Sequence, residues 1–142
     1  ISMKNSNECG YTLIMSTEII GLSHLEREII ANVVRYNIRD FDYDMMQLET
    51  EAGQDLAGVS DRTAITILIA KLTAILRLAN SMDKTHKSKL IDCRMAVREG
   101  QLVITTGYKG DLALESASFE QKAAFFEEIF GIRPVLKQKR RV

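Results

Sequence analysis

The chain has 142 residues, which suits one domain or two small lobes that share a core. Its composition, 46% hydrophobic and 27% charged, excludes a disordered chain. The formal net charge of zero gives the molecule no overall electrostatic signature of a nucleic-acid-binding protein, so no nucleic-acid partner is expected.

The cysteines and the first residues indicate where the chain works. Cys9 and Cys93 are far apart in the sequence, which predicts free thiols in a reducing, cytoplasmic compartment. The first residues lack the basic and apolar regions of a signal peptide. Because the chain starts at Ile1 rather than at a methionine, we expect it to be a piece of a longer protein.

Two helices are expected before residue 38. Residues 11–20 have at least partly helical character, and Gly21 ends it. Ser23 and Glu26 have the spacing of a capping box, in which each side chain accepts a hydrogen bond from a free backbone N–H group. The helix behind the box is expected to run to about Asn37. Its predicted apolar stripe is Leu25, Ile29, Ile30, Val33 and Val34, and its predicted water-facing residues are Arg27, Glu28, Asn32 and Arg35.

Residues 38–59 are polar and acidic, without a sustained period, and predict a long loop. Asp40, Asp42 and Asp44 alternate within it and could offer oxygen ligands to a cation. The glycine and the closing glutamate of a calcium loop are missing at the required offsets, which favours a solvated acidic loop.

Residues 60–83 are the longest apolar stretch and predict the central helix of the fold. Apolar residues cover every face of a 3.6-residue period, and Ser60 or Asp61 can cap the start. Such a helix is either buried or spans a membrane. Lys71 and Arg77 would be costly inside a bilayer, so we expect a soluble helix with these two residues on its less buried side and no membrane partner.

After this helix the period changes from 3.6 to 2. In residues 90–97 the alternation places Ile91, Cys93, Met95 and Val97 on one face of a strand. Glu99 and Gly100 predict a turn, residues 101–106 a second strand, and residues 112–116 a short third strand.

The last predicted elements are a helix and a strand. Ser118 to Gln121 has the pattern of a second capping box, and Gly131 is expected to be a left-handed C-cap. Pro134 removes a ladder donor, so residues 132–138 predict an edge strand. The helix between them spaces four apolar residues along one face: Phe119, Ala123, Phe126 and Phe130.

These elements predict an α+β fold. A helical lobe built round the long buried helix occupies residues 1–86, and a small ββ(β)αβ lobe occupies residues 87–142.

Searches for common catalytic motifs find no phosphate-binding glycine loop, no H-E-x-x-H and no nucleophile elbow. His24 and His86 are isolated, so no metal ligand set is predicted. Two basic groups remain, and they could form an anion site if they meet in space, although cations after a helix and at a chain end are commonly just solvated. The first comprises Lys84, His86, Lys87, Lys89 and Arg94, and the second Lys137, Lys139, Arg140 and Arg141.

Three runs carry a family resemblance: GLSHLEREIIANVVRYN at 21–37, IAKLTAILRLANSMDKTHKSK at 69–89, and LALESASFEQKAAFFEEIFGIRPVL at 112–136. They resemble the C-terminal region of the bacterial exopolyphosphatase and guanosine pentaphosphate phosphohydrolase (Ppx/GppA) family. The resemblance implies a parent whose actin-like N-terminal domain, absent from this chain, uses Mg²⁺ to release phosphate from polyphosphate. It also implies that this region begins as an HD-like helical domain and ends in a small α/β lobe.

Departures from the family pattern suggest that this piece is not catalytic alone. The His-Asp pair of HD enzymes would precede Ile1, and the chain has Ser6-Asn7-Glu8-Cys9, Asn37 and Asn80 where relatives have metal-liking residues. Asp83 remains, but one carboxylate does not hold a catalytic metal. No catalytic residue and no cofactor is therefore expected within this chain.

The resemblance implies a role in binding polyphosphate or guanosine pentaphosphate and in forming a homodimer. The expected anion contacts are Lys84, Lys87, Lys89 and Arg94. One alternative is a structural module without a ligand, which would dock a partner or a second copy through the apolar face of residues 118–130 or the strand at 132–137. Another is a standalone HD-type metal-dependent phosphohydrolase with unusual ligands.

Overall fold

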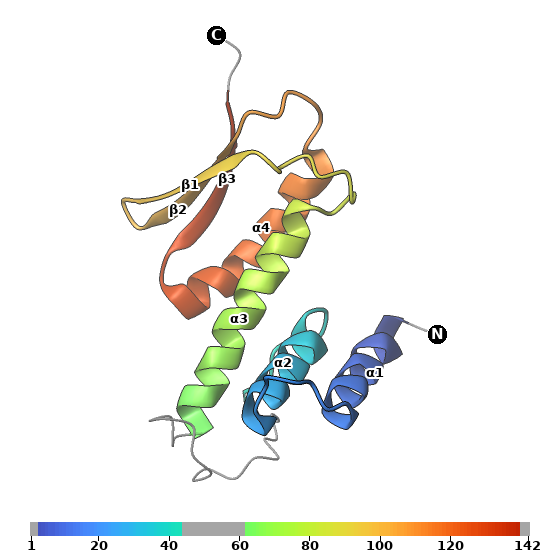
Figure 1. Ribbon diagram of the computed structural model, residues 1–142. Coiled ribbons are helices and arrows are strands. Elements are labelled where there is room, and N and C mark those ends of the chain that lie inside the picture. Colours follow the sequence, from blue (N-terminus) through green and yellow to red (C-terminus); the bar gives the residue numbers. More distant parts are fainter. Residues whose placement is uncertain (1–2, 44–61, 140–142) are drawn as a thin grey trace. The chain divides into compact units, whose positions relative to one another are not determined.

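The structure is a computed structural model that describes residues 3–43 and 62–139 (Figure 1). It divides into two compact units, Ile1–Thr73 and Ala74–Val142, and the division falls inside one long helix. The first unit is helical, and the second combines helices with a small sheet. The predicted α+β fold, with a helical N-terminal part and a strand-containing part after it, is confirmed. The predicted domain boundary after residue 86 stays a prediction.

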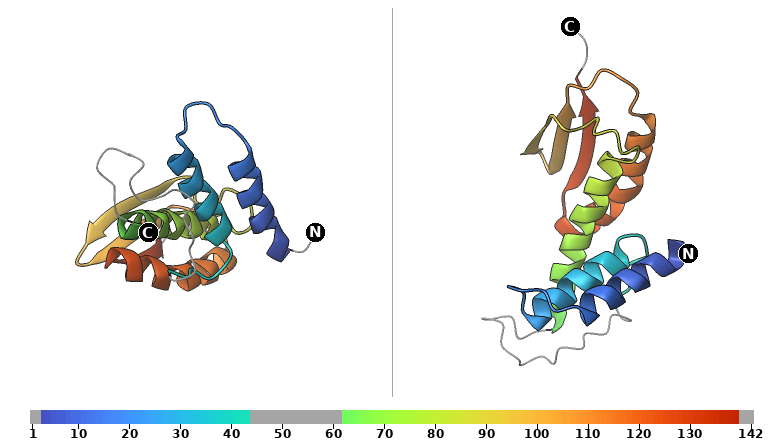
Figure 2. Two further views of the ribbon diagram at one scale, coloured as in Figure 1. Left: turned by 90° about the horizontal axis from the view of Figure 1, so that it is seen from below. Right: turned by 45° about the vertical axis from the view of Figure 1, so that its right-hand side comes forward.

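In the first unit, helices α1 (Met3–Ser16) and α2 (His24–Tyr36) lie side by side (Figure 2). Helix α1 begins well before the predicted residue 11. Its Gly10 permits a close approach of the two helices, because a Cβ atom there would lie 2.9 Å from Cγ1 of Val34. Helix α1 ends at Ser16, earlier than predicted, and Gly21 lies in the connection to α2 with φ of 90°, a backbone conformation that suits glycine.

The predicted capping box at the start of α2 is confirmed. The N–H group of Glu26 donates to Oγ of Ser23 at 3.1 Å, and the N–H group of Ser23 donates to Oε2 of Glu26 at 2.8 Å. Each contact satisfies a donor that a helix start leaves free. Asn37 is the C-cap, as the predicted end of the helix requires.

The buried face of α2 differs from the predicted stripe. Glu28 and Asn32, which were expected to face water, are fully buried, whereas Ile30 is 40% exposed. One face of α2 carries residues 25, 28, 29, 32 and 36, which follow the 3.6-residue period. Glu28 and Asn32 therefore lie on the same face as the core residues. Asn32 offsets part of the cost of its burial, since its amide donates to the carbonyl of Glu28 at 3.0 Å.

Helix α3 (Arg62–Met82) confirms the predicted long helix, and the proposed caps Ser60 and Asp61 lie outside the described residues. In the first unit its Ile65 and Ile69 join Leu25 and Ile29 in the core. Lys71 is exposed, as expected. Among the described helices, α3 alone is long and apolar enough to cross a membrane, a test that the core helix of a soluble protein also passes. The interpretation of α3 as a helix of a water-soluble domain stays a prediction.

After the end of α3, the second unit contains three strands and a further helix: β1 (Cys93–Arg98), β2 (Gln101–Thr106), α4 (Ala113–Phe130) and β3 (Arg133–Gln138). The sheet order is β1-β2-β3, with an antiparallel first pair and a parallel second pair. Helix α4 makes the connection that a parallel pair needs (Figure 1). The core of this unit is formed by Ala74, Leu78, Ile104, Phe119 and Phe126.

The predicted turn between the first two strands is confirmed. Glu99 and Gly100 have φ of 52° and 75°, which is the pattern of a two-residue type I′ hairpin. Cys93 of β1 is half-buried and packs against the core. Both cysteines are free thiols, and Cys9 is exposed.

Two details predicted for the segment before β3 are wrong. Residues 112–116 form no strand, because α4 already begins at Ala113, and Ser118 lies inside that helix rather than at its cap. The start is instead supported by Asp111, whose Oδ1 accepts a hydrogen bond from the N–H group of Ala113 at 2.8 Å. The spacing of Phe119, Ala123 and Phe126 still places all three in the core, as predicted.

The predicted end of the chain is confirmed. Gly131 is the left-handed C-cap of α4, with φ of 72°. Strand β3, with the buried Pro134, lies at one edge of the described sheet. The acidic segment is described only as far as residue 43, so Asp44 and the rest of the predicted loop lie outside the described residues.

Candidate functional site in the segment after the long helix

The basic segment between α3 and β1 is held in a folded conformation by its own contacts. The N–H group of Ser88 donates to Oδ1 of Asp83 at 3.0 Å, and the N–H group of His86 donates to the carbonyl of Asp83 at 3.0 Å. His86 and Ser88 have φ of 56° and 51°, in the left-handed region that residues other than glycine rarely adopt. Asp83, predicted as a surviving family carboxylate, therefore ties this segment together.

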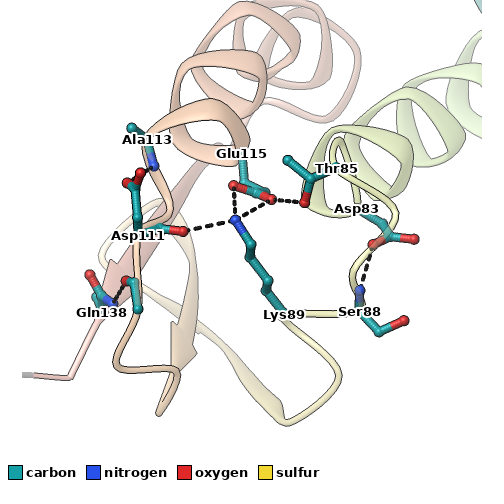
Figure 3. A network of polar contacts seen from close by, with 9 residues as sticks. Asp83, Thr85, Ser88, Lys89, Asp111, Ala113, Glu115 and Gln138 are labelled. Carbon is teal, nitrogen blue, oxygen red and sulfur yellow. Dashed lines mark hydrogen bonds and ion pairs between the residues drawn. The ribbon is translucent and has the colours of Figure 1, made fainter.

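Lys89 fastens the segment to the start of α4. Its ammonium group donates to the carbonyl of Asp111 at 2.9 Å and forms an ion pair with Glu115, with Nζ 3.2 Å from Oε1 (Figure 3). Oγ1 of Thr85 donates to the same Oε1 at 2.6 Å. The Glu115 side chain is 1% exposed and that of Lys89 is 14% exposed. Thr85 and Lys89 thus meet at one carboxylate that lies 30 and 26 residues further along the chain.

The surroundings of Glu115 favour its charged form. The hydrogen bond from Thr85 lowers the pKa of the Glu115 carboxyl most, and the hydrogen bond from its own backbone and the contacts with Lys89 lower it further. Burial acts in the opposite direction but does not outweigh these contacts. The carboxylate is therefore ionised at neutral pH and is matched by the Lys89 cation.

The other predicted anion contacts have a different setting. Lys84 and Lys87 belong to the same segment, and Arg94 belongs to β1; all three are exposed. Among the described residues, none of these three side chains forms a hydrogen bond or an ion pair. Sequence alone does not distinguish Lys84, Lys87 and Lys89. In the structure Lys89 has internal partners, whereas the side chains of Lys84 and Lys87 face water.

The strand register brings part of the two basic groups to one face of the sheet. Arg94 is paired with Thr105, and Thr105 is paired with Lys137, so the three side chains point to the same side. Two strand spacings separate Arg94 from Lys137, which is about 10 Å. Lys139 is exposed beyond the strand, and Arg140 and Arg141 lie outside the described residues.

Arg98 is a member of this face that the sequence analysis missed. It lies on the same side of β1 as Arg94, because side chains alternate with a period of two, and that alternation was the available signal. None of the residues that the three described strands place on this face is acidic. The fourth cation of the face, Arg133, is matched by Glu120 and Glu127 of α4, at 3.2 and 3.0 Å. The face can therefore attract an anion through Arg94, Arg98 and Lys137.

The positions where relatives have metal-liking residues serve other purposes here. Glu8 pairs with Arg35 and Arg39 of the same unit, at 3.0 and 2.8 Å. Asn37 is the C-cap of α2, and His24 is exposed at the start of that helix. Among the described residues, no three of the types His, Cys, Asp and Glu gather closely enough to hold a metal ion.

Comparison with known proteins identifies the family. The family model described as Ppx/GppA phosphatase, domain III, matches residues 1–123. The search of the curated proteins gave no significant match. The matched range contains the helical unit, the segment after α3, the β1–β2 hairpin and the start of α4, and it corresponds to a C-terminal region of that family. The chain therefore belongs to the Ppx/GppA phosphatase family.

Proposed function

We propose that the chain is a C-terminal domain of a cytoplasmic, exopolyphosphatase-like phosphatase that assists the binding of polyphosphate or guanosine pentaphosphate and supports a homodimer. In this proposal an actin-like domain upstream, with Mg²⁺, performs the hydrolysis. Family membership supports the class of the parent protein. The observation that carries the binding role is the contrast within one short segment: Lys89 has internal partners, whereas Lys84 and Lys87 face water.

The division of labour within the segment gives the proposal its geometry. Lys89 and Asp83 fix the course of the backbone, so Lys84 and Lys87 project from a segment that is already ordered. A preordered cation loses less conformational freedom when it binds an anion. Arg94 extends the positive charge onto β1, and Lys137 of β3 lies on the same face of the sheet. Of the four predicted contacts, we keep Lys84, Lys87 and Arg94 as contacts in this proposal and assign Lys89 a positioning role, because it has internal partners.

The test is a titration of the purified chain with fluorescently labelled polyphosphate at about 50 mM and about 200 mM salt. Binding that releases counterions weakens steeply with salt, so the slope of log K against log salt is negative. Each lost phosphate contact reduces the magnitude of this slope by about one. The double variant K84A/K87A should bind more weakly, and the magnitude of its slope should be smaller by about two. Lys89 is excluded from this variant because its loss would disturb the fold.

The matched control is K71A/K109A, which removes the same charge from two other exposed lysines. Its affinity and its salt slope should change much less than those of K84A/K87A. Equal losses in the two double variants would show that only net charge matters, and the assignment of Lys84 and Lys87 would then be wrong. Absence of binding to the unaltered chain at the lower salt concentration would remove the substrate-binding role altogether.

A second candidate function is a structural module that dimerises without a ligand. The exposed apolar edge of β1 favours it, with Met95 and Val97 59% and 64% exposed. A chain that dimerises but does not bind polyphosphate would support this candidate. The standalone HD-type phosphohydrolase has no comparable supporting observation among the described residues.

A further inference from the structure

The two edges of the described sheet differ in how well they are protected. Strand β3 carries Pro134, which offers no backbone donor, and none of the predicted docking residues Phe119, Ala123 and Phe126 is available, because all three are buried in their own unit. Among the described residues, no strand pairs with the outer edge of β1. An unpaired strand edge is a template for another strand.

The hairpin shows which backbone groups this edge offers. In a hairpin closed by a two-residue turn, the flanking residues, here Arg98 and Gln101, exchange hydrogen bonds. Such pairs alternate along an antiparallel ladder, so Ala96 and Arg94 also bond to β2. The N–H and C=O groups of the alternate residues, Cys93, Met95 and Val97, therefore point outward from the sheet.

The side chains of these same residues form an apolar rim. Register with Ile104 and Leu102 places Met95 and Val97 on the face of the sheet that carries the core, yet they are 59% and 64% exposed. Ile91, just before the strand, is 79% exposed. A groove of about 320 Å³ continues the rim, and its apolar lining includes Met82, Leu90, Ile91 and Met95. The free backbone edge and the uncovered apolar surface thus coincide.

We propose that this edge is occupied by β1 of a second copy of the chain, in antiparallel register centred on Met95. This inference rests on the dimerisation part of the proposed function and names its surface. A two-fold axis perpendicular to the sheet keeps the same face of both copies on the same side, so odd-numbered residues pair with odd-numbered ones and even-numbered residues with even-numbered ones. Met95 then pairs with Met95 of the second copy, Cys93 with Val97, and Asp92 with Arg98.

Charge selects this register over its neighbours. With Met95 at the centre, the exposed Asp92 and Arg98 face each other twice, once on each side of the axis. A register centred on Ala96 would place Arg94 opposite Arg98, and one centred on Arg94 would place two copies of that arginine together. Like charges directly opposite across a ladder are destabilising, and opposite charges are stabilising. A register centred on Cys93 would also pair Asp92 with Arg94, but it would place residues 96–98 opposite residues 88–90, which lie outside the strand. The register centred on Met95 combines opposite charges with pairing of residues 93–97 of both strands, which favours a second copy over an unrelated protein.

The first test is sedimentation equilibrium of the chain over a wide concentration range, with the variants R98D and D92R/R98D. Both positions are exposed, so the fold should persist, and circular dichroism verifies it. R98D places two acidic residues opposite each other and should raise the dimer dissociation constant about tenfold. D92R/R98D restores opposite charges and should return the constant to near its original value.

The second test fixes the register by crosslinking. In the background C9S/C93S, the variant M95C should form an intermolecular disulfide on mild oxidation, because directly opposed residues have a Cα separation within disulfide range. The control L114C alters an equally accessible apolar residue of the same unit, 64% exposed, and should not crosslink.

The outcomes separate the surface from the function. If the dimer dissociation constant is unaffected by R98D, or if M95C forms no intermolecular disulfide, the proposed β1 interface is wrong, although the chain still dimerises. A monomer at all concentrations overturns both the surface and the dimerisation role. The polyphosphate titration measures the binding role independently of either result.

Discussion

The two units of the chain obtain their stability in different ways. The described part of residues 74–142 has a core with two phenylalanines, Phe119 and Phe126, and a buried ion pair between Lys89 and Glu115. The described part of residues 1–73 has a buried aliphatic cluster against which Phe41 packs. Its polar features include a helix cap, the partly exposed ion pairs of Glu8, and the buried Glu28 and Asn32. The difference teaches that large aromatic rings carry much of the packing in the sheet-containing unit, whereas smaller aliphatic side chains form the buried cluster of the helical unit.

The largest expected effect is the loss of the central aromatic ring in the second unit. Phe119 is 1% exposed, so Phe119→Ala should lower the free energy of unfolding by about 3–5 kcal/mol, through lost burial and the cavity left behind. Denaturant unfolding measures the change, and Leu114→Ala, at an exposed site of the same helix, is the control. A loss below about 1 kcal/mol would mean that Phe119 is not central to this core.

The next effect is a dependence of stability on pH that comes from the second unit. The pKa of Glu115 is lower in the folded chain than its ordinary value, so its contribution to stability is complete above the ordinary pKa. The contribution is lost as the pH falls through the lowered, folded-state pKa. Thermal unfolding between about pH 6 and pH 2 should show this loss, and Glu115→Gln should reduce the pH dependence while lowering stability at neutral pH.

The control for this effect is Glu120→Gln, which removes an exposed carboxylate of the same helix. It should leave the acid profile close to that of the unaltered chain, because exposed ion pairs contribute little. An acid profile that Glu115→Gln leaves unchanged would contradict the assigned role of the buried carboxylate.

The smallest of these effects tests the helical unit. Ser23→Ala removes the side-chain acceptor at the start of α2 and should lower the free energy of unfolding by about 1 kcal/mol. Glu26→Gln keeps the capping-box pattern and should cost less. If Ser23→Ala destabilised the chain as much as Phe119→Ala, the contrast between the units would not hold.

Periodicity and spacing predicted most of the fold. The capping box at Ser23, the turn at Glu99 and Gly100, and the C-cap at Gly131 were predictable because each depends on a few adjacent residues. The burial of Glu28 and Asn32 was not, because polarity argues for exposure and only the packed partner decides which face turns inward. The extra strand at 112–116 was wrong because a short apolar alternation also fits the first turn of a helix.

The candidate site was predictable in composition but not in roles. The sequence identifies Lys84, Lys87, Lys89 and Arg94 as a basic group, and nothing in their order distinguishes them. The partner of Lys89, Glu115, lies 26 residues further along the chain, inside a helix predicted to start later than it does. The pairing of Arg94 with Lys137 across Thr105 likewise requires the register of a sheet whose parallel pair joins distant segments.

The parallel pairing of β2 with β3 also has a consequence for how the protein is made. The β1–β2 hairpin is local and can form as soon as residues 93–106 are available. Strand β3 follows α4, so Gln101 of β2 pairs with Arg133 of β3 only after the whole of α4 has been synthesised. Until then Phe119 and Phe126 lack the completed sheet they pack against, so the nascent chain carries an apolar helix that stays open to chaperones, or to aggregation, until β3 has been synthesised.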